Sequence, residues 1–223
     1  MPPSPTASTP APSSAATAST GDWVSLFDGR TLAGWHAFNK TTGAPSGWRV
    51  DEGAIHFAPG GDGGDIATDA QYGDFEFEVE WKIQACGNSG IFYRGAEGAA
   101  YNAVYLTAPE MQVLDDTCHP DARFPSHTAG GLYDLYVPRA AVVRPAGEWN
   151  QARIVARGGH IEHWLNGTMI VEAEQGSAAW NARVAASKFR TMPAFGTQRS
   201  GVIALQDHGD RVWYRALRIR TLG

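Results

Sequence analysis

The chain has 223 residues and a formal net charge of -5, with 43% hydrophobic and 18% charged residues. It contains no run of Arg and Lys interleaved with aromatic residues, which argues against nucleic acid as a partner. No uninterrupted apolar segment reaches the roughly 18 residues that would predict a membrane-spanning helix.

The N-terminal segment has an unusual composition, because residues 1–20 contain only Pro, Ser, Thr and Ala after Met1. Such a segment cannot bury enough apolar surface to fold, so we expect a disordered linker or tail. We expect residues 21–223 to form a single domain. Tracts of this kind often join a removed signal peptide or a lipidated N-terminus to an exported domain. The sequence therefore favours a periplasmic or extracellular protein, with a lipoprotein as one form of it.

Alternating apolar and polar residues dominate from Trp23 onward and predict a nearly all-β fold. The clearest strand is residues 74–84, in which Phe, Phe, Val and Trp alternate with Glu. A second strand, residues 88–95, follows within a few positions. We therefore expect these two strands to pair as an antiparallel hairpin.

Further strands are expected at residues 109–114, 150–156, 160–165, 168–173, 201–208 and 212–220. The Asn166-Gly167 dipeptide between two of them is a strong hairpin signal. Residues 176–186 are the one moderate helical candidate, with an irregular loop as the alternative. Many strands with few intervening helices predict two antiparallel sheets stacked as a sandwich or jelly roll.

The two cysteines, Cys86 and Cys118, allow at most one disulfide. Each lies beside polar, loop-like sequence, and two free thiols are as consistent with the sequence as a bridge. A zinc site is a weaker reading, because no second pair of residues has the spacing of metal ligands.

The segment at residues 200–214 ends a predicted strand with Gln206, Asp207 and His208. Side chains alternate across a strand, so Gln206 and His208 share one side of the pleat and Asp207 lies on the other. Buried imidazole and amide groups need hydrogen-bonding partners, so this pair fits a polar site on a sheet better than a core. The structural alternative is that both side chains only cap the following glycine turn.

Several blocks of sequence, taken in order, resemble the 3-keto-disaccharide hydrolase domain family, which has a concanavalin A-like lectin/glucanase fold. The blocks are VSLFDGRTLAGW, DFEFEVEWKI, NSGIFYRG, EMQVLDD, AGGLYDLY, GEWNQARIV, IEHWLNGTMIVE, SKF and GVIALQDHGDRVWYRALRIR. No single block is specific, but the ordered set spans most of the chain. EMQVLDD departs mildly from the family, in which an aromatic residue is expected near Met111.

The resemblance implies an all-β, concanavalin A-like jelly-roll sandwich of two antiparallel sheets that binds a 3-keto-glycoside. A ketone at C3 acidifies the proton on C2, so a base can remove that proton and form an enolate. The C1 substituent is then eliminated with the help of an acid, and water adds to the resulting enone. The resemblance also implies an upstream glycoside 3-oxidoreductase that makes the ketone.

His208 is the first candidate for the base, because an imidazole accepts protons near neutral pH. Gln206 is expected to bind substrate hydroxyls. On the predicted strand at 109–114, Glu110 and Gln112 share the face opposite Met111, so Glu110 is a candidate acid or alternative base and Gln112 a substrate ligand. A solvated carboxylate at a sheet edge is the structural reading of Glu110.

Further candidates lie on other predicted strands and loops. Glu80 and Arg94 lie on polar faces of consecutive strands and are expected to form a cross-strand pair, with Arg94 orienting substrate oxygens or stabilising the enolate. Lys188 is an alternative partner for the enolate, and Asn88 a contact for a sugar hydroxyl. Each of these residues also has a plain structural reading, as a surface salt bridge, a loop lysine or a turn residue.

His163 and Trp164 are candidate substrate-binding residues whose register is open. If Ile161 and Leu165 are in the core, His163 faces inward and Trp164 faces outward, where its ring could stack on a sugar. The opposite register, with His163 facing outward and Trp164 facing inward, is also consistent with the sequence.

No cofactor is certain from the sequence. Asp115 and Asp116 could hold calcium, manganese or zinc together with His119, His127 or Glu110. A metal ion there would take the place of Arg94 or Lys188 as the group that stabilises the enolate.

Two other function classes remain open. A noncatalytic carbohydrate-binding module on the same sandwich would need aromatic and amide groups but no base. A retaining glycosidase needs two carboxylates about 5 Å apart, and the Glu-x-Asp-x-x-Glu spacing common in sandwich glucanases is missing from this sequence.

Overall fold

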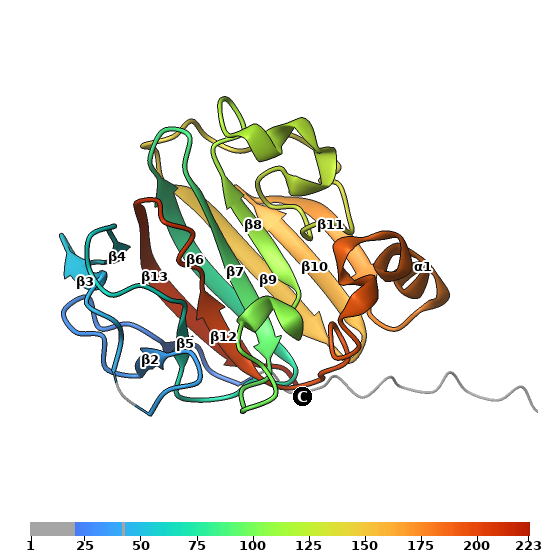
Figure 1. Cartoon of the computed structure of the whole chain (residues 1–223), viewed down its shortest axis with the longest axis horizontal. Helices are drawn as coiled ribbons and strands as arrows, with labels where there is room; N and C mark the ends of the chain where they lie inside the picture. The colour runs from blue at the N-terminus through green and yellow to red at the C-terminus, as the bar shows by residue number, and fades with distance from the viewer. Residues whose placement is uncertain (1–20, 42) are drawn as a thin grey trace, which may run out of the picture.

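The computed structural model describes residues 21–41 and 43–223. The tail expected at residues 1–20 lies outside the described residues. Within them, the strands form two antiparallel sheets, which we call the larger and the smaller sheet (Figure 1). None of the helices in this part of the chain is long and apolar enough to cross a membrane.

The larger sheet has the strand order β11-β10-β9-β6-β13-β4-β3, with β1 paired to β13. Its strands are β1 (Val24–Ser25), β3 (Trp48–Asp51), β4 (Ala54–Phe57), β6 (Phe75–Ile83), β9 (Asn150–Arg157), β10 (His160–Leu165), β11 (Thr168–Glu174) and β13 (Val212–Thr221). The smaller sheet has the order β2-β5-β12-β7-β8. Its strands are β2 (Trp35–Ala37), β5 (Ile66–Thr68), β12 (Val202–Leu205), β7 (Asn88–Gly95) and β8 (Glu110–Leu114). The predicted all-β sandwich of two antiparallel sheets is confirmed.

Among the residues that the structure describes, five short helical segments connect or cover the sheets: η1 (Val104–Leu106), η2 (Pro120–Arg123), η3 (Pro125–His127), α1 (Ala178–Ala186) and η4 (Lys188–Thr191). The predicted helix at 176–186 is confirmed as α1, which lies beside β11 (Figure 1). The Ser177 hydroxyl caps it by accepting a hydrogen bond from the Trp180 backbone N–H at 3.1 Å.

The core lies between the two sheets because each strand buries alternate side chains. On β6 the apolar residues Phe75, Phe77, Val79 and Trp81 are all 0–1% exposed, and the intervening glutamates point away from the core. The predicted alternation of this strand is therefore confirmed. The hairpin at Asn166-Gly167 is also confirmed, since it joins the antiparallel strands β10 and β11.

The hairpin predicted between residues 74–84 and 88–95 is wrong. β6 pairs with β9 and β13 in the larger sheet, whereas β7 pairs with β8 and β12 in the smaller sheet. Residues 84–87 cross from one sheet to the other. Both strands have an apolar face, and stacking them in opposite sheets buries those faces against each other.

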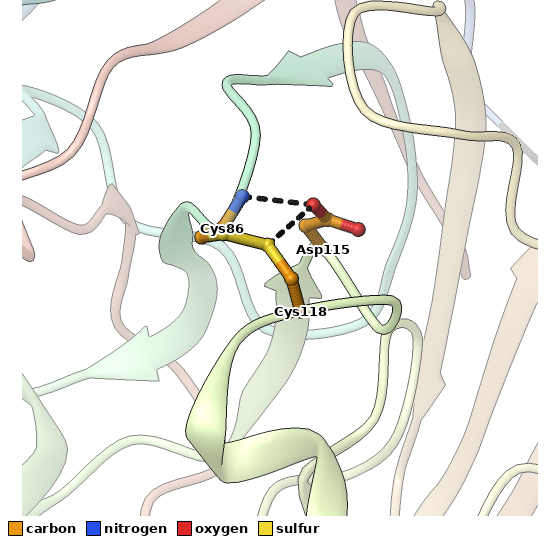
Figure 2. A group of neighbouring side chains, drawn as sticks. All are labelled: Cys86, Asp115 and Cys118. Carbon is orange, nitrogen blue, oxygen red and sulfur yellow. Dashed lines mark hydrogen bonds between the residues drawn. A yellow bond between two sulfur atoms is a disulfide. The ribbon is translucent and has the colours of Figure 1, made fainter.

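A disulfide joins Cys86, in this crossing segment, to Cys118 in the loop after β8 (Figure 2). The carboxylate of Asp115 accepts a hydrogen bond from the Cys86 backbone N–H at 2.8 Å. The bridge links positions 32 residues apart. Of the two alternatives that the sequence left open, the structure shows the disulfide and not two free thiols. It fixes the start of the loop at residues 115–134 relative to the smaller sheet.

Candidate active site

A polar patch occupies the face of the smaller sheet that points away from the core. Glu110 and Gln112 on β8 lie on this face, because Met111 and Val113, which alternate with them along the strand, belong to the core. In the neighbouring strand, Gly90 is the register partner of Gln112. Alternation along β7 and β8 therefore brings polar groups from both strands to one outer surface.

The same face continues onto β12 and the residues after it. Ala204 pairs with Phe92 on β7 and contacts it on the outer side, whereas Ile203 and Leu205 are in the core. The strand ends at Leu205, three residues earlier than predicted, but the Gln206 backbone N–H still donates to Gly90 O at 3.0 Å. Gln206 therefore lies beside β7 on the polar side of the sheet.

These side chains meet in a small pocket of about 40 Å³. It is lined by Asn88, Glu110, Gln112, Tyr133, Lys188, Gln206 and His208. Six of the ten predicted site residues are in this set, from segments spread over 120 positions of the chain, since the set runs from Asn88 to His208. The smaller sheet provides the floor, Tyr133 comes from the loop that follows β8, and Lys188 is the first residue of η4, which follows α1.

Glu110 is the central acidic group of the pocket and is only 4% exposed. A Cβ atom at Gly90 would overlap the Glu110 carboxyl group, so glycine at this position leaves the space that the carboxyl occupies. Burial raises the pKa of Glu110 to about 8, and the positive charge of Lys188 acts in the opposite direction. A carboxyl with this pKa holds its proton at neutral pH and can donate it.

Amide groups surround this carboxyl. When the Gln112 amide is oriented with its NH₂ group toward Ser89 O and Glu110 Oε1, both contacts are 3.1 Å long. Gln206 Oε1 is buried and has no hydrogen-bond partner among the described residues. A buried acceptor without a partner is costly, so this oxygen is available to a hydroxyl donor of a ligand.

Lys188 and Tyr133 form the other wall. The Lys188 ammonium lies 4.1 Å from the centre of the Tyr133 ring. The Lys188 backbone N–H donates a hydrogen bond to Asp134 Oδ2 at 2.8 Å. The Tyr133 hydroxyl donates to Asp121 at 3.2 Å, and His127 stacks on its ring at 4.2 Å. Desolvation is the main cause that raises the phenol pKa of Tyr133.

Tyr133 was missed by the sequence analysis. It lies in AGGLYDLY, a loop block with no regular alternation, so no strand periodicity could assign its side chain to a face.

His208 is an exposed residue at the mouth of the pocket, with its ring 6.5 Å from that of His119. The open position of His208 allows the imidazole to contact a ligand bound over Glu110.

Asp65 is a second carboxyl beside this site that the sequence analysis did not identify. It immediately precedes β5, and its Oδ1 accepts a hydrogen bond from the Asp207 backbone N–H at 3.0 Å. Burial raises the pKa of Asp65 to about 6. The Asp207 side chain turns away from the pocket and accepts hydrogen bonds from Gly64 and Gly209.

Arg94 does not join the pocket. Its side chain is 0% exposed, and its guanidinium donates to Gly73 O, Gly158 O, Gln175 Oε1 and Asp74 Oδ1 at 2.9–3.0 Å. These bonds use the donors that a substrate would need, so the prediction that Arg94 orients substrate oxygens is wrong. It is a buried structural arginine that ties together three loops.

Glu80 also lies elsewhere, and the expected Glu80–Arg94 pair is wrong because the two strands belong to different sheets. Glu80 is on the outer face of the larger sheet and binds Arg215 with an N–O distance of 2.7 Å. Its carboxylate is therefore on the opposite side of the sandwich from Glu110.

His163 and Trp164 adopt the register in which Ile161 and Leu165 are in the core. His163 is fully buried between the sheets and contacts the Tyr93 hydroxyl at 2.9 Å and Gly130 O at 3.0 Å. Burial lowers its pKa to about 4, so it is neutral and structural. Trp164 faces outward on the larger sheet, so neither residue reaches the pocket around Glu110.

The candidate metal ligands do not converge on one point. The Asp115 carboxylate accepts hydrogen bonds from the Cys86 backbone N–H and the Thr117 hydroxyl. The Asp116 carboxylate accepts one from the Ala129 backbone N–H. Within the described residues, the set of three potential ligand atoms that lie within 4.8 Å of one another is Cys86, Asp115 and Cys118 (Figure 2). The two sulfur atoms are joined in the disulfide and offer no thiolate, so this set does not fit a metal ion.

The pocket therefore combines a protonated buried carboxyl, an ammonium group, an exposed imidazole and three amides on one surface. This arrangement can donate a proton, stabilise a developing negative charge and bind hydroxyl groups. A polyhydroxylated substrate that undergoes acid–base chemistry fits these groups.

Comparison with known proteins agrees with this reading. The model of the 3-keto-alpha-glucoside-1,2-lyase-like domain matches residues 22–220. A 3-keto-disaccharide hydrolase from Bacteroides thetaiotaomicron is 35% identical over 228 residues, which cover 90% of this chain and 78% of that protein.

Solved structures give the same result. The crystal structure of a candidate glycosyl hydrolase from Parabacteroides distasonis is 34% identical, with a TM-score of 0.82 over 91% of this chain and 94% of the other. A second such protein from the same organism, at 22% identity and a TM-score of 0.72, covers 90% of this chain and 100% of its own and shows the fold alone. The jelly-roll fold is thus confirmed, and a glycosidase-like hydrolase function is supported. With the family model matching nearly its whole length, this chain belongs to the 3-keto-alpha-glucoside-1,2-lyase-like domain family, the 3-keto-disaccharide hydrolases expected from its sequence blocks.

Proposed function

We propose that this protein cleaves 3-keto-glycosides, including 3-keto-disaccharides, by elimination followed by water addition. The observation that supports the proposal best is the buried Glu110 carboxyl, with a pKa raised to about 8, in one pocket with Lys188 and His208. The match to a 3-keto-disaccharide hydrolase supports the substrate class.

In the proposed reaction His208 removes the proton from C2, and the electron pair of that C–H bond forms the enolate with the C3 carbonyl. The Lys188 ammonium stabilises the enolate oxygen. Collapse of the enolate breaks the bond from C1 to the leaving-group oxygen, and Glu110 supplies the proton that this oxygen needs. Water then adds to C1 of the enone and a proton returns to C2, so the net reaction is hydrolysis.

The other lining residues bind and orient the sugar in this proposal. Gln206 Oε1, which is buried without a partner among the described residues, accepts a hydrogen bond from a substrate hydroxyl. Asn88 and Gln112 bind further hydroxyls, and the Tyr133 ring packs against the substrate beside Lys188. An upstream glycoside 3-oxidoreductase supplies the ketone.

A periplasmic or extracellular location belongs to the same proposal. The Cys86–Cys118 disulfide supports it, because disulfides persist in oxidising compartments and are rare in the bacterial cytosol.

The test is release of p-nitrophenol from p-nitrophenyl 3-keto-α-glucoside and its β anomer, with the unoxidised glucosides as controls. We expect release from a 3-keto substrate alone, and exchange of the C2 hydrogen for deuterium when the reaction runs in D₂O. Glu110→Gln and His208→Asn should each lower kcat by at least about 100-fold. The matched controls are Glu172→Gln and His160→Asn, which alter exposed or partly exposed side chains on β11 and β10 in the larger sheet.

Release from the unoxidised glucosides at an equal rate would contradict the proposed mechanism. Binding of the 3-keto-glucoside without any release would instead favour a noncatalytic carbohydrate-binding module.

A further inference from the structure

The larger sheet carries a groove on the face that points away from the core, and the proposed reaction does not use it. One recess of about 440 Å³ is lined by Trp23, Ser25, Glu78, Val79, Glu80, Gln151, Ala216, Leu217 and Arg218. A second recess of about 160 Å³ is lined by Glu78, Gln151, Arg153, Trp164 and Gly167. Since the two recesses share Glu78 and Gln151, we describe them together as the outer groove.

A row of flat side chains runs along the outer groove. Strand register places Arg218 opposite Glu78, Glu78 opposite Arg153, and Arg153 opposite Trp164. At the other end, the Trp23 ring lies 4.6 Å from the Arg218 guanidinium. The row thus crosses β13, β6, β9 and β10 with an indole at each end. With about 4.8 Å between strands, the four spacings from β1 to β10 span about 19 Å.

A strained backbone position helps to form the groove. The register of β13 with β6 shifts between Arg215 and Arg218, and Ala216 within this bulge has a φ of 52°, a left-handed conformation that alanine rarely adopts. Bulges of this kind interrupt the flat surface of a sheet and are common beside binding sites. The exposed Ala216 lines the larger recess and leaves room that a larger side chain would fill.

The charged side chains that line the groove are already paired, either with one another or with neighbouring residues on the same face of the sheet. Glu78 accepts from Nε and Nη2 of Arg218, at 2.8 and 2.5 Å, and Glu80 accepts from Arg215 at 2.7 Å. Arg153 binds Glu76 at 2.9 Å, and its guanidinium lies 4.0 Å from the Trp164 ring. A ligand that fits this surface is therefore neutral, makes many hydrogen bonds to planar side chains, and has apolar faces for the indoles.

We propose that the outer groove is a second carbohydrate-binding site, which holds a neutral oligosaccharide of several rings. Sugar rings present hydroxyl groups around their edge and C–H groups on their faces, which match the carboxylate, guanidinium and amide groups and the two indoles respectively. The site lies on the sheet opposite Glu110, so a chain bound there stays clear of the pocket. It would hold the enzyme on a glycan and is independent of the proposed reaction.

A second copy of this chain fits the groove less well. The centre of a protein interface is depleted in acidic residues, whereas the Glu78 carboxylate lies at the centre of this groove and is shared by both recesses. A dimer is therefore an outcome for the experiment to exclude.

The experiment is affinity electrophoresis of the full chain in gels that contain soluble starch or hydroxyethylcellulose. The wild-type protein should be retarded in at least one of them, and Trp23→Ala and Trp164→Ala should each weaken the apparent affinity by about tenfold. The matched control is Trp213→Ala, because Trp213 lies on β13 outside both recesses and donates to Asp51. Turnover of the small 3-keto substrate should be unchanged in the Trp23 and Trp164 variants.

Glu110→Gln separates the two sites, since it should retain full retardation whether or not the protein cleaves 3-keto-glycosides. Absence of retardation in both gels would overturn the inference, and so would retardation that is lost in Glu110→Gln but kept in Trp164→Ala. A concentration-dependent dimer in sedimentation that Trp164→Ala abolishes would show that the groove is a protein interface instead.

Discussion

Replacement of Glu110 by Gln should make the protein more stable relative to wild type as the pH rises. The pKa of Glu110 is raised from 4.5 to about 8 by burial. A carboxyl that holds its proton more tightly in the folded than in the unfolded chain stabilises the fold most at low pH. Its contribution is lost as the pH rises from the unfolded value toward the folded one.

The expected size follows from this pKa difference. Between these two pKa values the free energy of unfolding falls by about 1.4 kcal/mol per pH unit, or about 5 kcal/mol in total. Glutamine has nearly the same shape and does not titrate, so the Glu110→Gln variant lacks this slope.

Other groups limit the window in which the effect is isolated. The pKa of His163 is lowered to about 4 and that of Asp65 is raised to about 6, so their contributions change with pH mainly below 6.5. The pKa of His36 is raised by its hydrogen bonds to Glu97 and Asp69, against desolvation, so its contribution is lost with rising pH in both proteins alike. The difference between wild type and variant from pH 6.5 to 8 therefore reports Glu110.

Urea unfolding at pH 6.5, 7.25 and 8 measures this difference. The free energy of unfolding of wild type minus that of Glu110→Gln should fall by about 2 kcal/mol across the window. If the free energies of unfolding of wild type and variant instead change with pH by the same amount, the inference that Glu110 is buried and protonated in the folded protein is refuted. This test does not depend on the proposed reaction.

Three further predictions concern other parts of the site and its support. Gly90→Ala places a Cβ atom against the Glu110 carboxyl, so it should destabilise the fold by about 1–3 kcal/mol in urea unfolding and lower turnover; wild-type values for both would contradict the close packing. Arg94→Met removes the donor to Gly73 O and breaks the ion pair of the buried guanidinium with Asp74, so it should cost about 3–5 kcal/mol, with an unchanged KM for the folded fraction, whereas a raised KM at full stability would restore a substrate-binding role. Replacing Cys86 and Cys118 by Ser should cost about 3–4 kcal/mol and make thermal unfolding insensitive to dithiothreitol; equal sensitivity in variant and wild type would show that reductant acts elsewhere.

The strands from β6 onward could be predicted from the sequence, because alternation of apolar and polar residues reports which face of a strand is buried. The short strands β1 to β5 were not predicted. Alternation does not report which strand lies next to which. Residues 74–84 and 88–95 are close in sequence, and that closeness suggested a hairpin, yet each strand pairs within its own sheet. Residues 84–87, between β6 and β7, cross from one sheet to the other, and nothing in their local sequence distinguishes a crossing from a turn.

The same limit explains which site residues could be predicted. Glu110, Gln112 and Gln206 were assigned to a polar face by alternation, and the structure places them together. Arg94 was predicted to share a face of β7 with Asn88, but the pairing of β7 with β12 is irregular at this end of the strand and Arg94 has a φ of 55°. Its guanidinium donates to Gly73, Gly158 and Gln175 instead. Alternation along a predicted strand therefore does not establish that two residues belong to the same site. A loop residue such as Tyr133 has no alternation from which its position could be predicted.

The proton affinity of Glu110 depends on residues that are far apart in the sequence. The smaller sheet alone would leave its outer face open to water, and a carboxylate there would be solvated and ionised at neutral pH. Gly90 leaves space for the carboxyl, and the segments that carry Tyr133 and Lys188 cover it. Tyr133 lies in the loop at residues 115–134, and the Cys86–Cys118 disulfide fixes the start of that loop to the sheet. The sheet thus supplies the acid and the loops supply its desolvation, so changes in residues 115–134 or 187–191 should alter the pKa of Glu110 without any change in the strand that carries it.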